Sequence, residues 1–227
     1  MLNNASSSLT RRRMRIVPSL LAEKFDAFIA LMEQAEVFAD CVQVDVMDGI
    51  FVETRSFPVE RINNVRTTLF FEVHLMVQDP FSFMSRISHP GLKKVIFQSE
   101  APAEPLALIN KITERGLVPG LAIKPETGID EFRAAGEHAD TLLFLTVDPG
   151  SYGHPFRPEV LTKVSEARKA FPDKVIAVDG GVSLDNLKMF YDVGVDYVCI
   201  GSRIFLQDDP GKSYRNFIEK VKEIEKG

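Results

Sequence analysis

Apolar residues recur along this chain with two alternating periods, one of two residues and one of three to four. Short runs with β-branched and other apolar residues at alternate positions are typical of strands. Between them, apolar residues recur at i, i+3, i+4 and i+7, as at Phe25, Phe28, Ile29 and Met32, which is typical of a helix. Eight strands are predicted in this way, over residues 14–17, 41–47, 69–75, 94–97, 118–123, 141–146, 175–178 and 197–200.

A helical segment is predicted after each of these strands. Proline marks the first turn of the helices that begin near Pro80 and Pro105, and Gly116 ends the second of them. A weaker helix is predicted over 58–65, and Ser183 is predicted to cap the helix after the seventh strand. Eight strand–helix units, spaced by about 25 residues without a linker, predict a single α/β domain with the (β/α)8 TIM-barrel fold. The alternative is an open doubly wound sheet, but the G-x-G-x-x-G turn of that fold is missing after the first strand.

The first 13 residues differ in composition from the rest. They are rich in Asn and Ser and end in Arg11-Arg12-Arg13, so we predict a disordered N-terminal extension over 1–13 and a barrel domain over 14–227. A basic, Ser-rich segment free of acids also suits a transit peptide, although it has no clear amphipathic pattern.

Composition narrows the classes of partner. A net charge of −5 and a pI of about 5.5 do not favour binding to nucleic acid or to an anionic membrane. No apolar run approaches the length of a membrane span. Cys41 and Cys199 lie in apolar runs and are interpreted as buried, reduced thiols, which fits a cytoplasmic location. The 17 phenylalanines favour self-association into a homo-oligomer, and the alternative is that the core absorbs most of them.

The run over 41–52 carries the first candidate chemistry. Because side chains alternate along a strand, Gln43, Asp45 and Met47 share one face. The other face is formed by Val42, Val44 and Val46. The valine face suits packing under helices. A buried carboxylate without a partner is costly, so Asp45 is predicted to face a metal, a cation or a substrate. The alternative is that Asp45 caps the turn that follows.

Other polar residues follow the remaining strands, and in barrels the chemistry lies at these carboxyl ends. Asp45, His74 and Asp179 come from the second, third and seventh strand ends and form a possible set of ligands for Zn, Mn or Fe. The alternative for His74 is a hydrogen-bonded core residue.

Glycines mark the last two strand ends. Gly180-Gly181 and Gly201-Ser202 follow the seventh and eighth strands, where barrels frequently bind phosphate through backbone N–H groups. A third loop, over 148–154, is long enough to act as a lid. The alternative for each loop is a plain surface turn.

Over 14–205 the chain resembles the ribulose-phosphate 3-epimerase family, and the segment 146–161 resembles members that act on allulose 6-phosphate. The matching motifs are Pro18-Ser19-Leu20-Leu21, Val44-Asp45-Val46-Met47-Asp48-Gly49 with Phe51-Val52, Val73-His74-Leu75-Met76, Thr146-Val147-Asp148-Pro149-Gly150, Val178-Asp179-Gly180-Gly181 and Gly201-Ser202. The resemblance implies a barrel of the ribulose-phosphate-binding type.

The resemblance also implies an isomerase of carbohydrate metabolism, within the pentose phosphate pathway. Asp45 and Asp179 would exchange the proton at C3 of a ketose phosphate through a metal-stabilised cis-enediolate. That would convert ribulose 5-phosphate to xylulose 5-phosphate, or act on allulose 6-phosphate. His74 would ligate the divalent metal together with the two Asp residues. Two further groups of residues would bind the sugar and the phosphate of the substrate. The sugar set is Ser19, Met47, His74 and Met76, and the phosphate set is Gly150, Ser151, Tyr152, Gly153, Gly180, Gly181, Gly201 and Ser202.

The chain departs from the family pattern around this site. Gln43 stands where the family has a second metal-binding His, and its amide oxygen is a poorer zinc ligand than imidazole. Gln98 stands where a His is usual, and Lys124 where an Asn is usual. Glu53-Thr54 replaces Pro-Asn, and Gly-Ser-Tyr-Gly-His over 150–154 replaces Gly-Phe-Gly-Gly-Gln.

Three hypotheses follow from these departures. The first is a 3-epimerase whose altered metal site includes Gln43. The second is a phosphosugar-binding barrel that lacks the metal and the activity. The third is aldolase- or lyase-type chemistry in which Lys124 replaces the metal charge or forms an imine, although a strand-end lysine is also a common surface residue.

Overall fold

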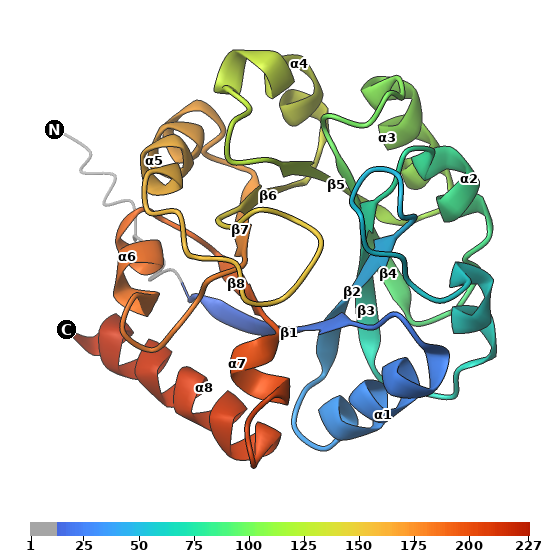
Figure 1. Ribbon diagram of the computed structural model, residues 1–227. Coiled ribbons are helices and arrows are strands. Elements are labelled where there is room, and N and C mark those ends of the chain that lie inside the picture. The colour runs from blue at the N-terminus through green and yellow to red at the C-terminus, as the bar shows by residue number, and fades with distance from the viewer. Residues whose placement is uncertain (1–12) are drawn as a thin grey trace, which may run out of the picture.

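The computed structural model describes residues 13–227, so the predicted extension lies almost wholly outside the described residues. Eight parallel strands pair in chain order and close between β8 and β1, which confirms the (β/α)8 barrel (Figure 1). The strands are β1 (Arg15–Leu21), β2 (Cys41–Met47), β3 (Phe70–Met76), β4 (Leu92–Gln98), β5 (Val118–Ile123), β6 (Thr141–Leu145), β7 (Val175–Asp179) and β8 (Tyr197–Ile200).

Helices surround the barrel as its outer layer (Figure 1). They are α1 (Phe25–Glu36), the 3₁₀ helix η1 (Val59–Asn64), α2 (Pro80–Ser85), α3 (Pro105–Glu114), α4 (Ile129–His138), α5 (Val160–Ala170), α6 (Leu187–Asp192), α7 (Ser202–Phe205) and α8 (Pro210–Lys226). The loop between β6 and α5, yellow in Figure 1, extends over the centre of the barrel.

Local sequence signals misplaced some boundaries. β1 does not end before Pro18, because Pro18 pairs with Ile200 and Ser19 pairs with Gln43, so tertiary pairing continues the strand beyond the proline. Ser183 is not the cap of α6: Asn186 holds that position, and Ser183 and Asn186 exchange hydrogen bonds in the preceding turn. α7 was not predicted because four residues are too few to show a period.

Two apolar cores stabilise the fold. The larger one lies between strands and helices and includes the valine face of β2, as its alternation predicted. The smaller one fills the barrel interior and consists of Val17, Ile96, Ala122, Leu143, Ala177, Tyr197 and Cys199.

The amino-terminal end of the barrel interior holds a buried charged group. The Lys94 ammonium lies 3.0 Å from the Glu72 carboxylate, and the Tyr197 hydroxyl donates to the same carboxylate at 2.9 Å. Lys94 also donates to the Tyr197 hydroxyl at 3.1 Å. These three residues satisfy one another, as buried charges require.

Three composition-based expectations can be compared with the described residues. Over 13–227, no helix is long and apolar enough to cross a membrane. Both cysteines are free thiols, but Cys41 is only partly buried, because it begins β2 at the barrel's edge. Phe70 is the one exposed residue among the 17 phenylalanines, so the core accounts for the Phe content and this content gives no support for self-association.

Candidate active site

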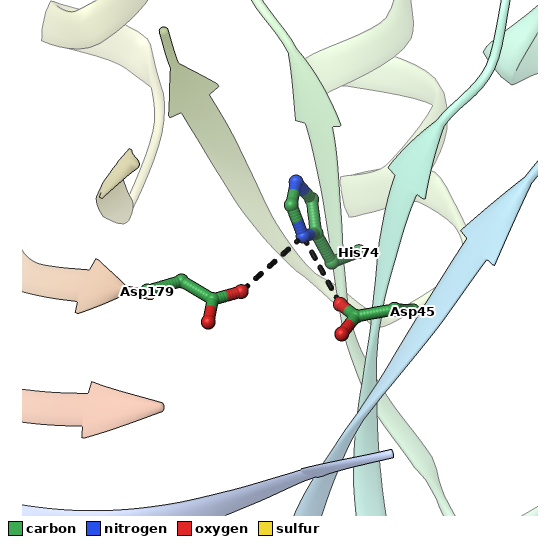
Figure 2. A group of neighbouring side chains, drawn as sticks. All are labelled: Asp45, His74 and Asp179. Atoms are coloured by element: carbon green, nitrogen blue, oxygen red, sulfur yellow. Dashed lines mark hydrogen bonds and ion pairs between the residues drawn. The ribbon is translucent and has the colours of Figure 1, made fainter. Parts of the chain in front are cut away.

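Two carboxylates and an imidazole meet at the carboxyl end of the barrel. Asp45 lies near the carboxyl end of β2, His74 lies beside it on β3, and Asp179 ends β7 on the opposite side (Figure 2). His74 Nδ1 lies 3.2 Å from Asp45 Oδ1 and 3.7 Å from Asp179 Oδ2. The in-register pairing of Asp45 with His74 fixes the first contact, and closure of the barrel produces the second.

Two glutamine amides complete this cluster. The Gln43 amide nitrogen donates to Asp45 Oδ1 at 2.9 Å and to Asp179 Oδ2 at 2.7 Å. The Gln43 oxygen accepts from the Cys199 thiol at 3.1 Å. Gln98 lies behind the imidazole, with its amide nitrogen 2.9 Å from His74 Nε2. Both glutamines are buried, so their amides hold the three ionisable groups in place.

The surroundings shift the acid–base properties of the cluster. Burial, followed by repulsion from Asp179, raises the pKa of Asp45 to about 6. For His74, burial opposes protonation, but the Asp179 and Asp45 carboxylates outweigh it and raise the imidazole pKa to about 9. A carboxyl with a pKa near neutrality can both accept and release a proton at physiological pH, which is what general acid–base catalysis requires.

The same cluster can hold a divalent metal. One ligand atom from each of Asp45, His74 and Asp179 lies within 4.8 Å of the others. Ligands about 2.0–2.2 Å from a tetrahedral zinc ion lie about 3.3–3.6 Å apart, which the imidazole–carboxylate separations of 3.2 and 3.7 Å approach. The residues therefore fit a metal with three protein ligands and an open side. The Gln43 amide lies beside these ligands with its nitrogen, and not its oxygen, toward the carboxylates, so in this orientation it offers no fourth ligand atom.

The cluster lies at the base of a cavity of about 650 Å³. Most of the implied substrate residues line it: Ser19, Asp45, His74, Met76, Gly150, Ser151, Tyr152, Gly153, Asp179, Gly180, Gly181, Gly201 and Ser202. Met47, which was expected to line the sugar, is buried and is not among the lining residues. Gln43 is not among the lining residues either, and it contacts the cavity lining through Asp45, Asp179 and Cys199.

Lys124 does not take the place that imine chemistry would need. Its ammonium lies 4.1 Å from the centre of the Phe51 ring, and Lys124 is absent from the residues that line the cavity. The lysine therefore connects the loops after β5 and β2, and the hypothesis of a Lys124 imine is not supported.

Tyr152 links the loop after β6 to the opposite side of the cavity. Its hydroxyl accepts from the backbone N–H of Leu21 and donates to the carbonyl of Ser19, both at 3.2 Å. Its ring lies directly against Gly201, where a Cβ atom would be only 2.4 Å from a ring carbon. Glycine at 201 is thus required for the loop to cover the cavity as it does.

A group of charges fixes the two ends of this loop. Arg157 forms ion pairs with Asp148, Glu159 and Glu126, the last from the loop after β5. The ends of the loop are therefore held together while its tip contacts β1 through Tyr152.

Three polar residues of the cavity were missed by the analysis of the sequence. Asn186, Arg203 and Gln207 line it beside the glycine loops after β7 and β8. The position of Arg203, two residues after Gly201, was the one available signal, because a cation close to a phosphate-type loop is a candidate ligand.

Comparison with known proteins agrees with this geometry. Residues 15–205 match the family model described as the Ribulose-phosphate 3 epimerase family. A ribulose-phosphate 3-epimerase of Schizosaccharomyces pombe is 31% identical over 218 residues, which cover 92% of this chain and 96% of the relative. One from Mycobacterium tuberculosis is 34% identical, with 86% of this chain and 87% of the relative covered.

Solved structures share the fold at lower identity. The 3-hexulose-6-phosphate synthase of Salmonella typhimurium has a TM-score of 0.67 and 18% identity, covering 93% of this chain and all of that one, at 100%. The orotidine 5'-monophosphate decarboxylase of Sulfolobus solfataricus has a TM-score of 0.64 and 12% identity, covering 93% and 99%. At these identities the likeness concerns the barrel alone.

Proposed function

The chain belongs to the ribulose-phosphate 3-epimerase family, and on that premise we propose that it is an isomerase that inverts C3 of a ketose phosphate. The observation that carries the proposal is the placement of Asp45 and Asp179 on opposite strands at one cavity, with His74 between them. Inversion needs a base on one face of the sugar and an acid on the other, and two opposed carboxylates can supply both.

The proposed reaction consists of two proton transfers. One carboxylate removes the C3 proton, and the electrons of the C3–H bond form a C2–C3 double bond while the C2 carbonyl oxygen takes the negative charge. The other carboxyl group then delivers its proton to C3 from the opposite face, and the C2 carbonyl forms again. The two carboxyls thus exchange roles in the reverse direction, as a near-neutral pKa for Asp45 permits.

A divalent cation is part of the proposal. Asp45, His74 and Asp179 would hold it, and when bound it supplies positive charge beside the developing oxyanion. Zn, Mn and Fe suit this mixture of oxygen and nitrogen ligands. Ser19 and Met76 would line the sugar, and the glycine loops would bind the phosphate through backbone N–H groups.

The test is exchange of deuterium from solvent into C3 of the substrate. Ribulose 5-phosphate and allulose 6-phosphate would each be incubated in D₂O with the protein, with and without added zinc, manganese or iron. We expect exchange and inversion of one of the two sugars. Asp45→Asn and Asp179→Asn should each reduce the rate by at least about a hundredfold, the usual scale of a general acid–base contribution.

Asp173→Asn is the matched control, because this exposed loop carboxylate is outside the cavity. Exchange at the wild-type rate in both cluster variants would contradict the two-carboxylate assignment.

A second candidate is a phosphosugar-binding barrel without turnover. The hydrogen bonds from Gln43 to both carboxylates favour it, because the amide satisfies these groups without a cation. Saturable binding of a ketose phosphate, with no C3 exchange under any metal condition, would support this candidate over the first.

Two further expectations accompany the proposal. The cytoplasmic location is supported by one relative of 30% identity, the cytoplasmic isoform from Oryza sativa, and cell fractionation would test it. Assembly into a homo-oligomer stays a prediction, which sedimentation of the purified protein would test.

A further inference from the structure

Arg203 lies where two cavities adjoin. It is in the short helix α7, directly after Gly201-Ser202, and it lines the main cavity beside the glycine loops. It also lines a second cavity of about 350 Å³, which shares Ser183 and Gln207 with the first. Arg203 is thus a solvent-exposed residue that borders both cavities.

The fold does not use the charge of this arginine. Within residues 13–227, the Arg203 side chain has no hydrogen-bond or ion-pair partner, whereas Arg157 and Arg133 are each bound to carboxylates. An arginine at a cavity wall that no protein group engages is available to a ligand.

The charge of the cavity shows why such a ligand needs Arg203. Among the described lining residues it is the only Lys or Arg, while Asp45, Asp148 and Asp179 contribute carboxylates. The chain as a whole carries a net charge of −5. The glycine loops offer backbone dipoles but no full charge, and the His74 imidazole is already engaged by Asp45 and Asp179, so Arg203 is the lining cation that remains available to a phosphate dianion.

We propose that Arg203 is a binding residue for the phosphate group of the substrate, at the junction of the two cavities, with Ser183 and Gln207 as neighbouring hydrogen-bonding groups. The inference rests on the proposed function in that the substrate is a phosphorylated ketose. A guanidinium matches a phosphate monoester geometrically, because two parallel N–H groups can donate to two phosphate oxygens. Arg203 sets specificity for the phosphorylated sugar over the free sugar and takes no part in proton transfer.

Binding to the complete chain tests this independently of turnover. Affinities for inorganic phosphate, ribulose 5-phosphate and unphosphorylated ribulose would be measured calorimetrically for Arg203→Ala and Arg203→Lys, each in an Asp45→Asn background. We expect Arg203→Ala to weaken binding of both phosphate-containing ligands by about 10- to 100-fold, the scale of a charge-assisted contact. The affinity of Arg203→Lys for the same two ligands should lie between those of the parent and Arg203→Ala. The affinity for ribulose should not change in either variant.

Lys212→Ala is the matched control, since it removes one positive charge from α8 outside both cavities and should leave all three affinities unchanged within about twofold. Affinities for the phosphate-containing ligands that are equal in Arg203→Ala and the parent would overturn the inference. The inference would also be overturned if Arg203→Ala lost as much affinity for unphosphorylated ribulose as for the phosphate-containing ligands.

The two proposals fail separately. If phosphate binding depends on Arg203 but no ketose phosphate exchanges its C3 proton, the proposed reaction is wrong and the anion site stands. If exchange occurs with an unchanged KM in Arg203→Ala, the reaction stands and the anion site is wrong.

Discussion

The amide nitrogen of Gln43 donates a hydrogen bond of 2.7 Å to Asp179, from the second strand of the barrel to the seventh. The same nitrogen donates to Asp45, its neighbour on β2, at 2.9 Å. One neutral side chain therefore holds two carboxylates that would otherwise repel each other inside the barrel. Its oxygen is occupied by Cys199, so the amide is fixed at both ends.

Replacing Gln43 by Leu removes the donor that both carboxylates share. Both carboxylates would keep their contact with His74 but lose the amide donor. The loss of a hydrogen bond to a buried acceptor costs about 1–3 kcal/mol, so we expect the unfolding free energy of Gln43→Leu to fall by that amount in metal-free protein. Urea denaturation measures it. Gln34→Leu, an exposed position on α1, is the control and should change stability by less than about 0.5 kcal/mol. Equal stability of the two variants would show that the amide is dispensable.

The Asp45 carboxyl should titrate near pH 6 in chelator-treated protein, because burial and Asp179 raise its pKa from 3.8 to about 6. A raised pKa means that the carboxyl is neutral below pH 6 and ionised above it, so its capacity to act as a base is lost as the pH falls through 6. Carbon-13 NMR of the side-chain carboxyls measures this, and Asp45→Asn identifies the signal. Adding zinc should lower the midpoint, because a cation stabilises the ionised form. A metal-free midpoint at 3.8 would contradict the account of the site.

Metal binding should depend on His74 and, to a smaller degree, on Gln98. Loss of a group that hydrogen-bonds a ligating histidine costs about 10- to 100-fold in affinity, which we expect for Gln98→Leu. His74→Leu, which loses a ligand itself, should bind zinc more weakly still. Competition with a chromogenic chelator measures the affinities, and His138→Leu, at the end of α4, is the control. Wild-type affinity in His74→Leu would exclude this cluster as the metal site.

The sequence was sufficient for the parts of the site that strand order alone determines. Carboxyl ends of parallel strands in a closed barrel meet at one rim, so Asp45, His74 and Asp179 could be expected together from their positions after three predicted strands. The two faces of β2 followed from alternation in the same way. These inferences require only the barrel fold and the two-residue alternation of side chains along a strand, and no knowledge of individual contacts.

The supporting contacts could not be predicted, because they join strands far apart in the chain. That Gln43 bridges to Asp179 and binds Cys199 depends on the registers of β2, β7 and β8, 136 and 156 residues apart. Arg203 carried one signal, its position two residues after Gly201, but an arginine in a short helix is ordinarily a surface residue, so the signal was not used. The continuation of β1 beyond Pro18 was missed because the proline was interpreted as the end of the strand. In the structure, pairing of β1 with β2 and with β8 outweighs this local signal.

Lys94 should be required for stability at the other end of the barrel. Lys94→Met leaves the Glu72 carboxylate buried without its cation, and breaking such a pair costs about 3–5 kcal/mol. Urea denaturation of Lys94→Met should show a loss of that size, and adding Glu72→Gln to it should restore part of the loss, since the uncompensated charge is gone. Lys93→Met, the exposed neighbour, is the control. A double variant no more stable than the single one would show that the charge is not the cause.

Tyr152 should control how well the loop after β6 covers the substrate. Its hydroxyl makes both hydrogen bonds to β1, and burial raises its pKa, so it stays protonated and able to donate at neutral pH. Tyr152→Phe keeps the ring against Gly201 but loses both bonds. We expect KM for the ketose phosphate to rise about tenfold with kcat little changed, the scale of one or two neutral hydrogen bonds. Proteolysis within 148–154 should also become faster.

Tyr191→Phe provides the comparison for this prediction, since it removes a hydroxyl from α6 outside the cavity. An equal KM in Tyr152→Phe and Tyr191→Phe, together with unchanged proteolysis, would mean that the ring and not the hydroxyl holds the loop. In that case Tyr152→Ala should raise KM where Tyr152→Phe does not, because the contact with Gly201 would then be the one that closes the cavity.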